Sequence, residues 1–255
     1  HMQNHENSFD ILKKNFLEFI NNLPFYGLCL LNIDDINTKS IINKISRPIK
    51  TFGVDDHADY QAKLICVDTI PAKYCYTENG NLYEMKLNMP GKHNVMNSLA
   101  ALSVARELNV PIKVIQEALE SFPGISRRFE IVGEFKINKN IFTWVDDYGH
   151  HPTEMKEVLE TIKKVWVNKK LVMVFQPHRY SRTAEHFNQF IDILKNVDHL
   201  VLMDIYAATE QPLDNINSEA IVGEIKKYNK NVVLINNEDE VSNYLDKIIE
   251  NKNIL

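Results

Sequence analysis

The 255-residue sequence has no apolar run approaching the roughly 18 residues that a membrane span needs. Its first twenty residues are polar and helical in pattern, so a secretory signal is not expected. Cysteine is scarce: Cys29, Cys66 and Cys75 form an odd set of widely spaced thiols, which argues against a disulfide framework. We therefore expect free, buried thiols in a reducing cytoplasm.

The sequence also has little excess charge of either sign. Lys and Arg number 29 against 34 Asp and Glu, for a net charge of -5. A broad surface for nucleic acid or for an anionic membrane is therefore not expected, although a local basic pocket is compatible with this balance. An apolar content of 44% excludes disorder as the main state and is ample for a buried core.

Two catalytic motifs are absent from these residues. There is no Gly-x-Ser-x-Gly nucleophile motif and no Gly-x-x-x-x-Gly-Lys-Ser/Thr loop to hold phosphates. We also find no repeat of fixed period and no low-complexity linker. The chemistry must therefore be sought in less regular clusters of polar residues.

The first part of the chain combines helices with β-patterned segments. Asn79-Gly80 lies between two such segments and predicts a tight hairpin. Ser8 is a plausible cap for a first helix whose apolar face comprises Phe9, Leu12, Phe16, Phe19 and Ile20. The expected elements are a helix at 8–20, a strand at 28–33, a helix at 37–45, β structure over 51–87, and helices at 95–108 and 111–121.

After Pro123 the pattern changes to alternating strands and helices, which predicts an α/β fold with a mostly parallel sheet. We place a domain boundary at this proline, dividing residues 1–123 from residues 124–255. The first part has too few strands for a complete α/β domain. The expected elements of the second are strands at 129–135, 141–145, 171–175, 199–203 and 232–235, and helices at 153–165, 183–194, 218–227 and 238–249.

Three strands of the second part run directly into polar clusters, at residues 146–152, 176–182 and 204–210. Ligands of open α/β sheets bind beyond the carboxyl ends of the strands, so we expect these three loops to line one cleft. Solvated loop polarity would explain any one cluster alone, but it explains three at the same edge poorly.

His178, Arg179 and Arg182 fall within five residues at the start of a predicted helix. Arginine offers a planar fork to carboxylate or phosphate, and helix N-terminal amides favour anions, so an anion site is predicted; the alternative is a solvated basic face. His150-His151 suggests a metal site, but adjacent residues point in different directions and no further ligand has zinc-site spacing. We expect no metal there.

Two further pairs have open interpretations. Arg127 and Arg128 precede a predicted strand; within a strand they would face opposite ways, so only one would reach a cleft. Asn94 and Asn97 share a face at the start of a predicted helix. Two roles fit Asn94 equally well. It could cap the helix, or its side-chain amide could form hydrogen bonds with the edge of a nucleotide base.

Four segments then carry a family resemblance: Pro90–Asn97, Gly124–Glu130, Asp146–Glu154 and Phe175–Thr183. In this order they closely resemble the Mur ligases of bacterial peptidoglycan synthesis, above all the member that adds the first amino acid, L-alanine. The resemblance extends over essentially the whole chain from residue 22 onward.

The resemblance implies three domains: a UDP-binding domain, a central ATPase domain with a phosphate loop, and a Rossmann-like C-terminal domain. Residues 1–123 correspond to the C-terminal part of the central domain, beyond its phosphate loop, and residues 124–255 to the Rossmann-like domain. We therefore expect these residues alone to be inactive. His1-Met2 aligns with a segment whose His helps to hold magnesium, but it also fits a cloning remnant, so no metal ligand is assigned.

The implied reaction is cytoplasmic and uses ATP, with magnesium, to activate the lactyl carboxylate of UDP-N-acetylmuramate as an acyl phosphate. The amine of L-alanine then displaces phosphate. This chemistry needs positioning and cationic stabilisation more than a protein nucleophile. Nucleic acid and membrane insertion play no part in it.

The resemblance also implies roles for individual residues. In the intact enzyme, His93, Asn94 and Asn97 would meet the adenine side of ATP, while one of Arg127 and Arg128, with Asp147, would contact ribose and phosphates. His178, Arg179 and Arg182 would hold the substrate or alanine carboxylate, Tyr148 would border the alanine side chain, and His150 would lie close to the reaction. The sequence departs from the family at Ala208, where glycine is usual.

A different class of function also fits the second part. It could be a non-catalytic α/β module that binds a nucleotide or an acidic ligand through the loop containing His178, Arg179 and Arg182. An open reading frame that extends upstream into a phosphate loop would favour the ligase.

Overall fold

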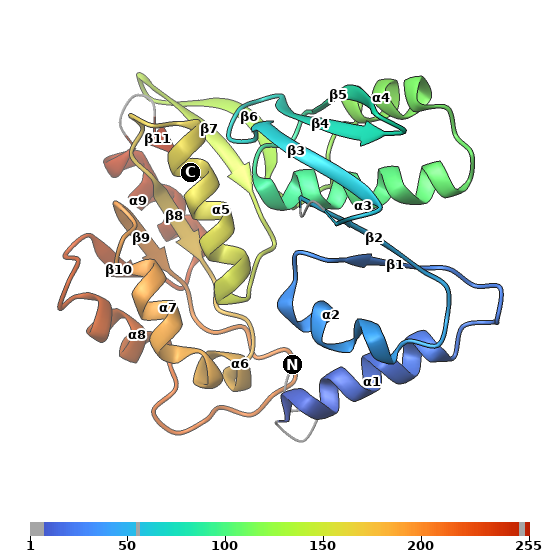
Figure 1. Ribbon diagram of the computed structural model, residues 1–255. Coiled ribbons are helices and arrows are strands. Elements are labelled where there is room, and N and C mark those ends of the chain that lie inside the picture. Colours follow the sequence, from blue (N-terminus) through green and yellow to red (C-terminus); the bar gives the residue numbers. More distant parts are fainter. Residues whose placement is uncertain (1–7, 55–56, 250–252) are drawn as a thin grey trace. The chain divides into compact units, whose positions relative to one another are not determined.

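The computed structural model describes residues 8–54, 57–249 and 253–255. The chain divides into two compact units, His1–Pro123 and Gly124–Leu255, and each has its own buried core (Figure 1). In the described ranges no helix combines the length and the apolar character that crossing a membrane requires.

The first unit contains one five-stranded sheet. Neighbouring strands β1 to β3 run parallel, whereas β3, β4 and β5 are antiparallel. The strands, in sheet order, are β1 (Cys29–Asn32), β2 (Ile49–Gly53), β3 (Tyr60–Cys66), β4 (Ala72–Glu78) and β5 (Asn81–Leu87). The helices are α1 (Phe9–Asn21), α2 (Ile36–Ile41), the 3-10 turn η2 (Ile42–Lys44), α3 (Lys92–Glu107) and α4 (Ile112–Glu120).

The predicted hairpin is confirmed. Strands β4 and β5 pair from Ala72–Leu87 to Glu78–Asn81, which leaves Asn79 and Gly80 as a two-residue turn. Both turn residues have positive φ angles, 51° and 77°, as a type I′ turn requires.

The expected buried face of α1 is largely wrong. Ser8 caps the helix as predicted, but only Ile20 is buried, whereas Phe16 and Phe19 are 56% and 72% exposed. The core instead forms between the sheet and helices α3 and α4, through residues such as Tyr74 and Leu99. Periodicity identified the helix but not whether another element covers its apolar side.

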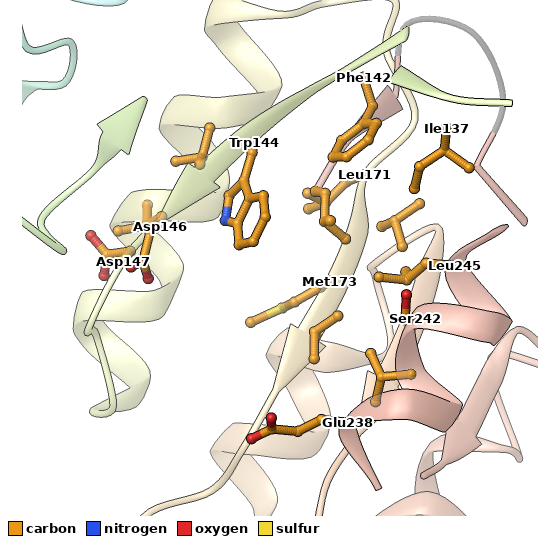
Figure 2. Close-up of a pocket in the computed structure, with 16 residues that line it drawn as sticks. Ile137, Phe142, Trp144, Asp146, Asp147, Leu171, Met173, Glu238, Ser242 and Leu245 are labelled. Atoms are coloured by element: carbon orange, nitrogen blue, oxygen red, sulfur yellow. The ribbon is translucent and has the colours of Figure 1, made fainter. Parts of the chain in front are cut away.

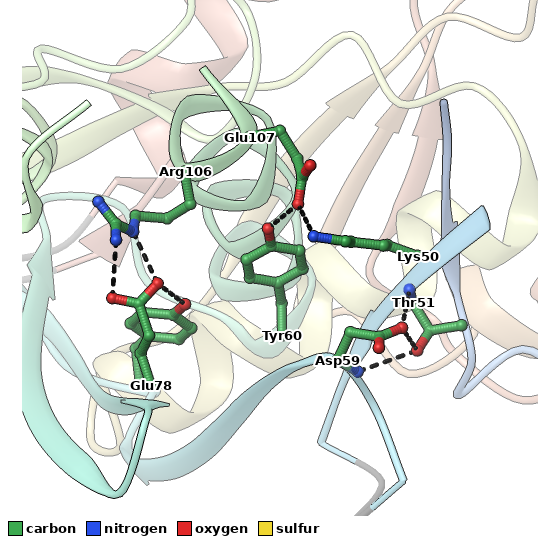
Figure 3. Close-up of polar contacts among 8 residues, drawn as sticks. Lys50, Thr51, Asp59, Tyr60, Glu78, Arg106 and Glu107 are labelled. Carbon is green, nitrogen blue, oxygen red and sulfur yellow. Dashed lines mark hydrogen bonds and ion pairs between the residues drawn. The ribbon is translucent and has the colours of Figure 1, made fainter. Parts of the chain in front are cut away.

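Charged side chains bind the C-terminal end of α3 to the sheet (Figure 3). Glu107 accepts hydrogen bonds from the Lys50 ammonium at 2.5 Å and from the Tyr60 hydroxyl. Arg106 donates to both carboxylate oxygens of Glu78, at 2.8 and 2.9 Å. Burial and the neighbouring Glu107 carboxylate raise the pKa of Tyr60, so its hydroxyl stays a donor. These contacts fix the direction of α3, whose first turn carries the candidate adenine residues.

The second unit alternates strands and helices, apart from an initial hairpin. Its strands are β6 (Glu130–Ile137), β7 (Asn140–Asp146), β8 (Val172–Phe175), β9 (His199–Leu202), β10 (Val232–Leu234) and β11 (Asn253–Ile254). Its helices are α5 (Pro152–Val165), α6 (Tyr180–Glu185), α7 (Phe187–Leu194), α8 (Ser218–Ile225) and α9 (Glu238–Ile248).

The sheet of this unit is mostly parallel, as the alternation predicted. Strands β10, β9 and β8 pair in parallel, and so do β11 and β7, while β6 and β7 form an antiparallel hairpin. A parallel bridge between Leu171 and Ile254 joins the two three-stranded groups. Side chains such as Leu200, Phe190 and Ile221 fill the core.

The helix expected at 183–194 is two helices. Helix α6 begins earlier than expected, at Tyr180. It ends at Glu185, and His186 separates it from α7. No proline or glycine marks this break, so the sequence pattern does not reveal it. The early start is relevant to the site because it places Arg179 at the N-cap position.

Candidate functional site

The three polar loops of the second unit line one pocket of about 400 Å³, as expected from their position after β7, β8 and β9. Arg127, which precedes β6, completes the wall. The lining residues are Arg127, Asp146, Asp147, Tyr148, Gly149, His150, Val174, Phe175, Gln176, His178, Met203 and Tyr206.

Tyrosine and histidine rings in contact with one another form much of this wall. His178 lies between His150, at 5.9 Å between ring centroids, and Tyr206, which stacks on it at 5.4 Å. Tyr148 meets His150 edge-on at 5.3 Å, and the Arg127 guanidinium lies over the Tyr148 ring at 4.8 Å. The pocket thus combines flat apolar faces with ring nitrogens and a cation.

Hydrogen bonds define the tautomers of these histidines. His150 Nδ1 lies 3.0 Å from the Tyr148 carbonyl oxygen, which only accepts, so Nδ1 carries a proton and Nε2 of the neutral ring is free of one. His178 Nδ1 faces Arg182 Nη1, which only donates, so this nitrogen accepts. Burial, and then the Arg182 charge, lower the pKa of His178, which is therefore neutral at pH 7.

The two arginines of the predicted anion site lie beside the pocket but do not line it. Arg182 is only 7% exposed and donates to the His178 carbonyl at 3.2 Å, whereas Arg179 is exposed. Among the described residues no carboxylate forms an ion pair with either guanidinium. Burial and the neighbouring Arg179 lower the pKa of Arg182. A buried cation without a paired carboxylate favours an anionic ligand.

The expectation that helix N-terminal amides add to this anion site is wrong. The Glu210 carboxylate already occupies the first turn of α6, where it accepts from Ser181 N at 2.9 Å and from Ser181 Oγ at 2.6 Å. Sequence reasoning noted Glu210 only as a nearby acid. Its partner lies 29 positions away, and no local pattern connects the two.

The strand expected to begin at Phe129 begins at Glu130, and only Arg127 of the two preceding arginines lines the pocket, as expected, although alternation within a strand is not the reason. The two arginines lie in a turn, and Arg127 and Phe129 have φ angles of 58° and 48°. Arg127 lines the pocket and pairs with Asp146 at 3.6 Å. Arg128 is exposed and is not part of the pocket wall.

Asp147 lines the pocket but also holds its backbone in place. Its carboxylate accepts from Phe129 N at 2.8 Å and from Gly149 N at 2.6 Å. Phe129 is buried and stacks on Trp166 at 6.3 Å between centroids. A Cβ at Gly149 would lie 2.6 Å from Asp147 Oδ1, so any other residue there would displace this carboxylate. Sequence reasoning missed this supporting role.

His150 and His151 have separate surroundings. His150 lines the pocket, whereas His151 caps α5: its Nδ1 accepts from Thr153 N at 3.2 Å, and Glu154 completes a capping box. In the ranges that the structure covers, no three His, Cys, Asp or Glu side chains are placed to hold a metal ion. The magnesium assignment considered for His1 lies outside the described residues.

The candidate adenine residues lie in the first turns of α3, in the first unit. Asn94 is 8% exposed and donates to the Pro90 carbonyl at 2.8 Å, which is a capping contact. Asn97, one turn later, is exposed, and His93 is half-buried. The amide of Asn94 thus has a structural partner, while that of Asn97 faces solvent.

A second cavity of the second unit, about 500 Å³, lies along β7, β8 and α9 (Figure 2). Its wall is mostly apolar, with Phe142, Trp144, Leu171 and Met173 around it. Strand β11 pairs with β7 at Phe142 and Thr143, and Val145 N donates to Leu255 O at 2.8 Å. Sequence reasoning did not anticipate this cavity, whose polar lining residues are Asp146, Asp147, Glu238 and Ser242.

Comparison with protein families gives two matches in chain order. The family model described as Mur ligase middle domain matches residues 1–105, and the one described as Mur ligase, glutamate ligase domain, matches residues 127–255. Together they cover nearly the whole chain.

The curated relatives agree with these matches. The chain is 41% identical to UDP-N-acetylmuramate–L-alanine ligase of Vesicomyosocius okutanii, over 100% of this chain and 55% of that protein. It is 43% identical to the ligase of the same name from Hydrogenovibrio crunogenus, over 87% of this chain and 48% of that one. The chain thus spans about half the length of the curated relatives it matches.

Among solved structures, UDP-N-acetylmuramate-alanine ligase from Thermotoga maritima matches with a TM-score of 0.71 at 27% identity. The match covers 100% of this chain and 53% of that one. A murein peptide ligase from Psychrobacter arcticus, at 21% identity and a TM-score of 0.66, shares the fold.

Proposed function

The chain belongs to the Mur ligase family, and on that premise we propose that it forms part of an ATP-dependent ligase that joins L-alanine to UDP-N-acetylmuramate. The curated relatives at about 40% identity carry the name of that ligase. The pocket of the second unit supports the assignment of this unit as the part that receives the amino acid.

One observation carries this proposal: the buried Arg182 guanidinium beside the pocket, which has no carboxylate partner among the described residues. Such a group favours a carboxylate or phosphate ligand. Of the two carboxylates in the proposed reaction, the lactyl group must react with phosphate, whereas that of L-alanine stays ionised throughout. We therefore assign Arg182, with Arg179, to the carboxylate of L-alanine.

The pocket wall supplies groups suited to the rest of L-alanine. The ring of Tyr148 borders a space that fits a small apolar side chain, next to His150 and His178. His150 Nε2 can accept a hydrogen bond from the attacking amine and can take its proton, because Nδ1 holds the other ring proton. Neutral His178 carries its ring proton on Nε2, because Nδ1 accepts from Arg182 Nη1. Its Nε2 can therefore donate a hydrogen bond to a ligand. Catalysis here consists of orienting the amine and accepting its proton.

Residues of each unit are assigned roles toward the nucleotide, as the family resemblance implies. We assign Arg127, which lines the pocket, to the phosphates, and we assign no such role to Arg128. Asp147 is assigned to the ribose, and this contact would be made in addition to the hydrogen bonds that its carboxylate accepts from the loop backbone. His93, Asn94 and Asn97 are assigned to the adenine side. When bound, ATP supplies the phosphoryl group that activates the carboxylate. Among the described residues, no three His, Cys, Asp or Glu side chains are placed as ligands for magnesium.

The test uses a protein of the full length of these relatives that contains this chain. With UDP-N-acetylmuramate, L-alanine and ATP together, we expect phosphate release and a product heavier by one alanine residue. In the cell, we propose that this reaction takes place in the cytoplasm. Omission of any one substrate should abolish both signals. Nucleotide binding without product would contradict the proposal and favour a binding module.

A further inference from the structure

The first turn of α6 is closed by a side chain from a different loop. Its N-cap residue, Arg179, has a φ of 75° and makes no side-chain capping bond. Glu210, in the loop between β9 and α8, supplies the acceptor instead, through both of its contacts with Ser181. A carboxylate at this position satisfies amides that the helix itself leaves unpaired.

The backbones of the two loops are also joined. Tyr206 N donates to Pro177 O and Arg179 N donates to Tyr206 O, both at 2.8 Å. The Thr183 hydroxyl, which is buried, donates to Arg179 O at 2.8 Å. The peptide units on both sides of Arg179 are therefore held, and Glu210 adds a contact to the helix at Ser181.

The segment that delivers Glu210 has an unusual backbone. Ala208 and Thr209 have consecutive positive φ angles of 47° and 75°, although both carry a Cβ and threonine is β-branched. Such conformations persist only where surrounding contacts hold them. Glu210 N donates to Ala207 O at 3.0 Å, and the carboxylate bonds to Ser181 hold the other end.

Glu210 does not neutralise the arginines directly. Within the described part of the chain it forms no ion pair with Arg179 or Arg182. Burial raises the pKa of its carboxyl, but hydrogen bonds from Ser181 and the Arg179 charge outweigh this and lower it, so the group is ionised at neutral pH. Its hydrogen bonds go to Ser181 at the helix start, so neither guanidinium group has an ion-paired carboxylate among the described residues.

We propose that Glu210 is a positioning residue, which fixes the turn from Arg179 to Arg182 in the orientation that receives the carboxylate of the amino-acid substrate. This inference rests on the function proposed above and deepens it. Glu210 itself touches no substrate; it acts through Ser181 and the backbone of α6.

The test compares Glu210→Gln with Asp214→Asn, which removes an exposed carboxylate from the same loop. In the full-length ligase we expect Glu210→Gln to raise KM for L-alanine about tenfold, because a charge-assisted contact is lost, and to leave KM for ATP within about twofold. Ser181→Ala removes only one of the bonds and should raise KM for L-alanine less. Asp214→Asn should match the wild type.

Amide hydrogen exchange of the 255-residue chain gives a second readout. Residues 181–183 should exchange faster in Glu210→Gln than in Asp214→Asn, while the core of the second unit stays protected. Faster exchange with an unchanged KM for L-alanine would make Glu210 merely structural and overturn the proposal, as would an equal rise in KM for L-alanine and ATP. A wild-type protein without ligase activity would overturn the proposed function, and the positioning role with it.

Discussion

Several residues around the pocket both face it and hold neighbouring groups in place. His178 lines the pocket and contacts Arg182 behind it, and Asp147 lines the pocket while its carboxylate accepts from the loop backbone. Arg179 differs from them because its side chain has no partner among the residues described and is exposed. A change at Arg179 should therefore affect ligand binding with little effect on folding.

We expect Arg179→Ala to reduce kcat/KM for L-alanine by about 10- to 150-fold in the full-length ligase, because one or more hydrogen bonds to a charged partner are lost. Arg179→Lys keeps the charge but loses the planar fork, so it should remain clearly impaired. Steady-state kinetics and thermal unfolding measure the two effects separately. Near-wild-type kinetics for Arg179→Ala, comparable to those of exposed Lys226→Ala, would leave Arg179 without a role.

His178 predicts a pH dependence of stability. Burial and then the Arg182 charge lower its pKa below the ordinary 6.5, so the folded state binds fewer protons than the unfolded state. The contribution of His178 to the free energy of unfolding is therefore complete above about pH 6.5. It is lost as the pH falls through the lowered pKa of the folded state. Denaturant unfolding of the chain between about pH 8 and about pH 5 should show this decline, and it should be smaller in His178→Gln. An equal decline in both proteins would contradict the assignment.

At the scale of elements, the two-residue turn between β4 and β5 shows how backbone geometry decides the sign of a substitution. Gly80 has a φ of 77°, and a Cβ there would meet no atom within 4 Å. Gly223 lies inside helix α8, where a Cβ would likewise meet nothing within 4 Å, but its φ is ordinary. The two positions therefore differ in conformation and not in crowding.

We expect Gly80→Ala to destabilise the first unit by about 1 kcal/mol, because alanine is disfavoured at positive φ. Gly223→Ala should stabilise the second unit by up to about 1 kcal/mol, since alanine favours a helix. Thermal or denaturant unfolding of the two variants measures both. A loss of stability in both variants would contradict the argument that φ decides the sign of the effect.

Much of the element pattern could be predicted from the sequence, because it depends on local signals. Asn79-Gly80 specified its hairpin, and the position of three polar loops after parallel strands located the pocket. Several features that sequence reasoning missed have no recognisable local signal. The break at His186, the exposed Phe19 and the turn at Arg127 have no local signature, and Glu210 reaches Ser181 from another loop.

At the scale of the whole molecule, the 255 residues contain the pocket but no phosphate loop of the Gly-x-x-x-x-Gly-Lys-Ser/Thr type. Phosphoryl transfer depends on backbone amides and a lysine that hold the β- and γ-phosphates. We therefore expect no phosphate release by this chain alone in the presence of ATP, magnesium, UDP-N-acetylmuramate and L-alanine. A colorimetric phosphate assay against the full-length ligase is the measurement, and comparable turnover would contradict the prediction.

The division into two units has an optical consequence. The sequence has two tryptophans, Trp144 beside the apolar cavity and Trp166 stacked on Phe129, and both belong to the second unit. The first unit contains tyrosines such as Tyr74 and Tyr76 in its core instead. Emission excited selectively at tryptophan therefore monitors the second unit, whereas far-ultraviolet circular dichroism monitors both. The difference between the two traces isolates the melting of the first unit without a label.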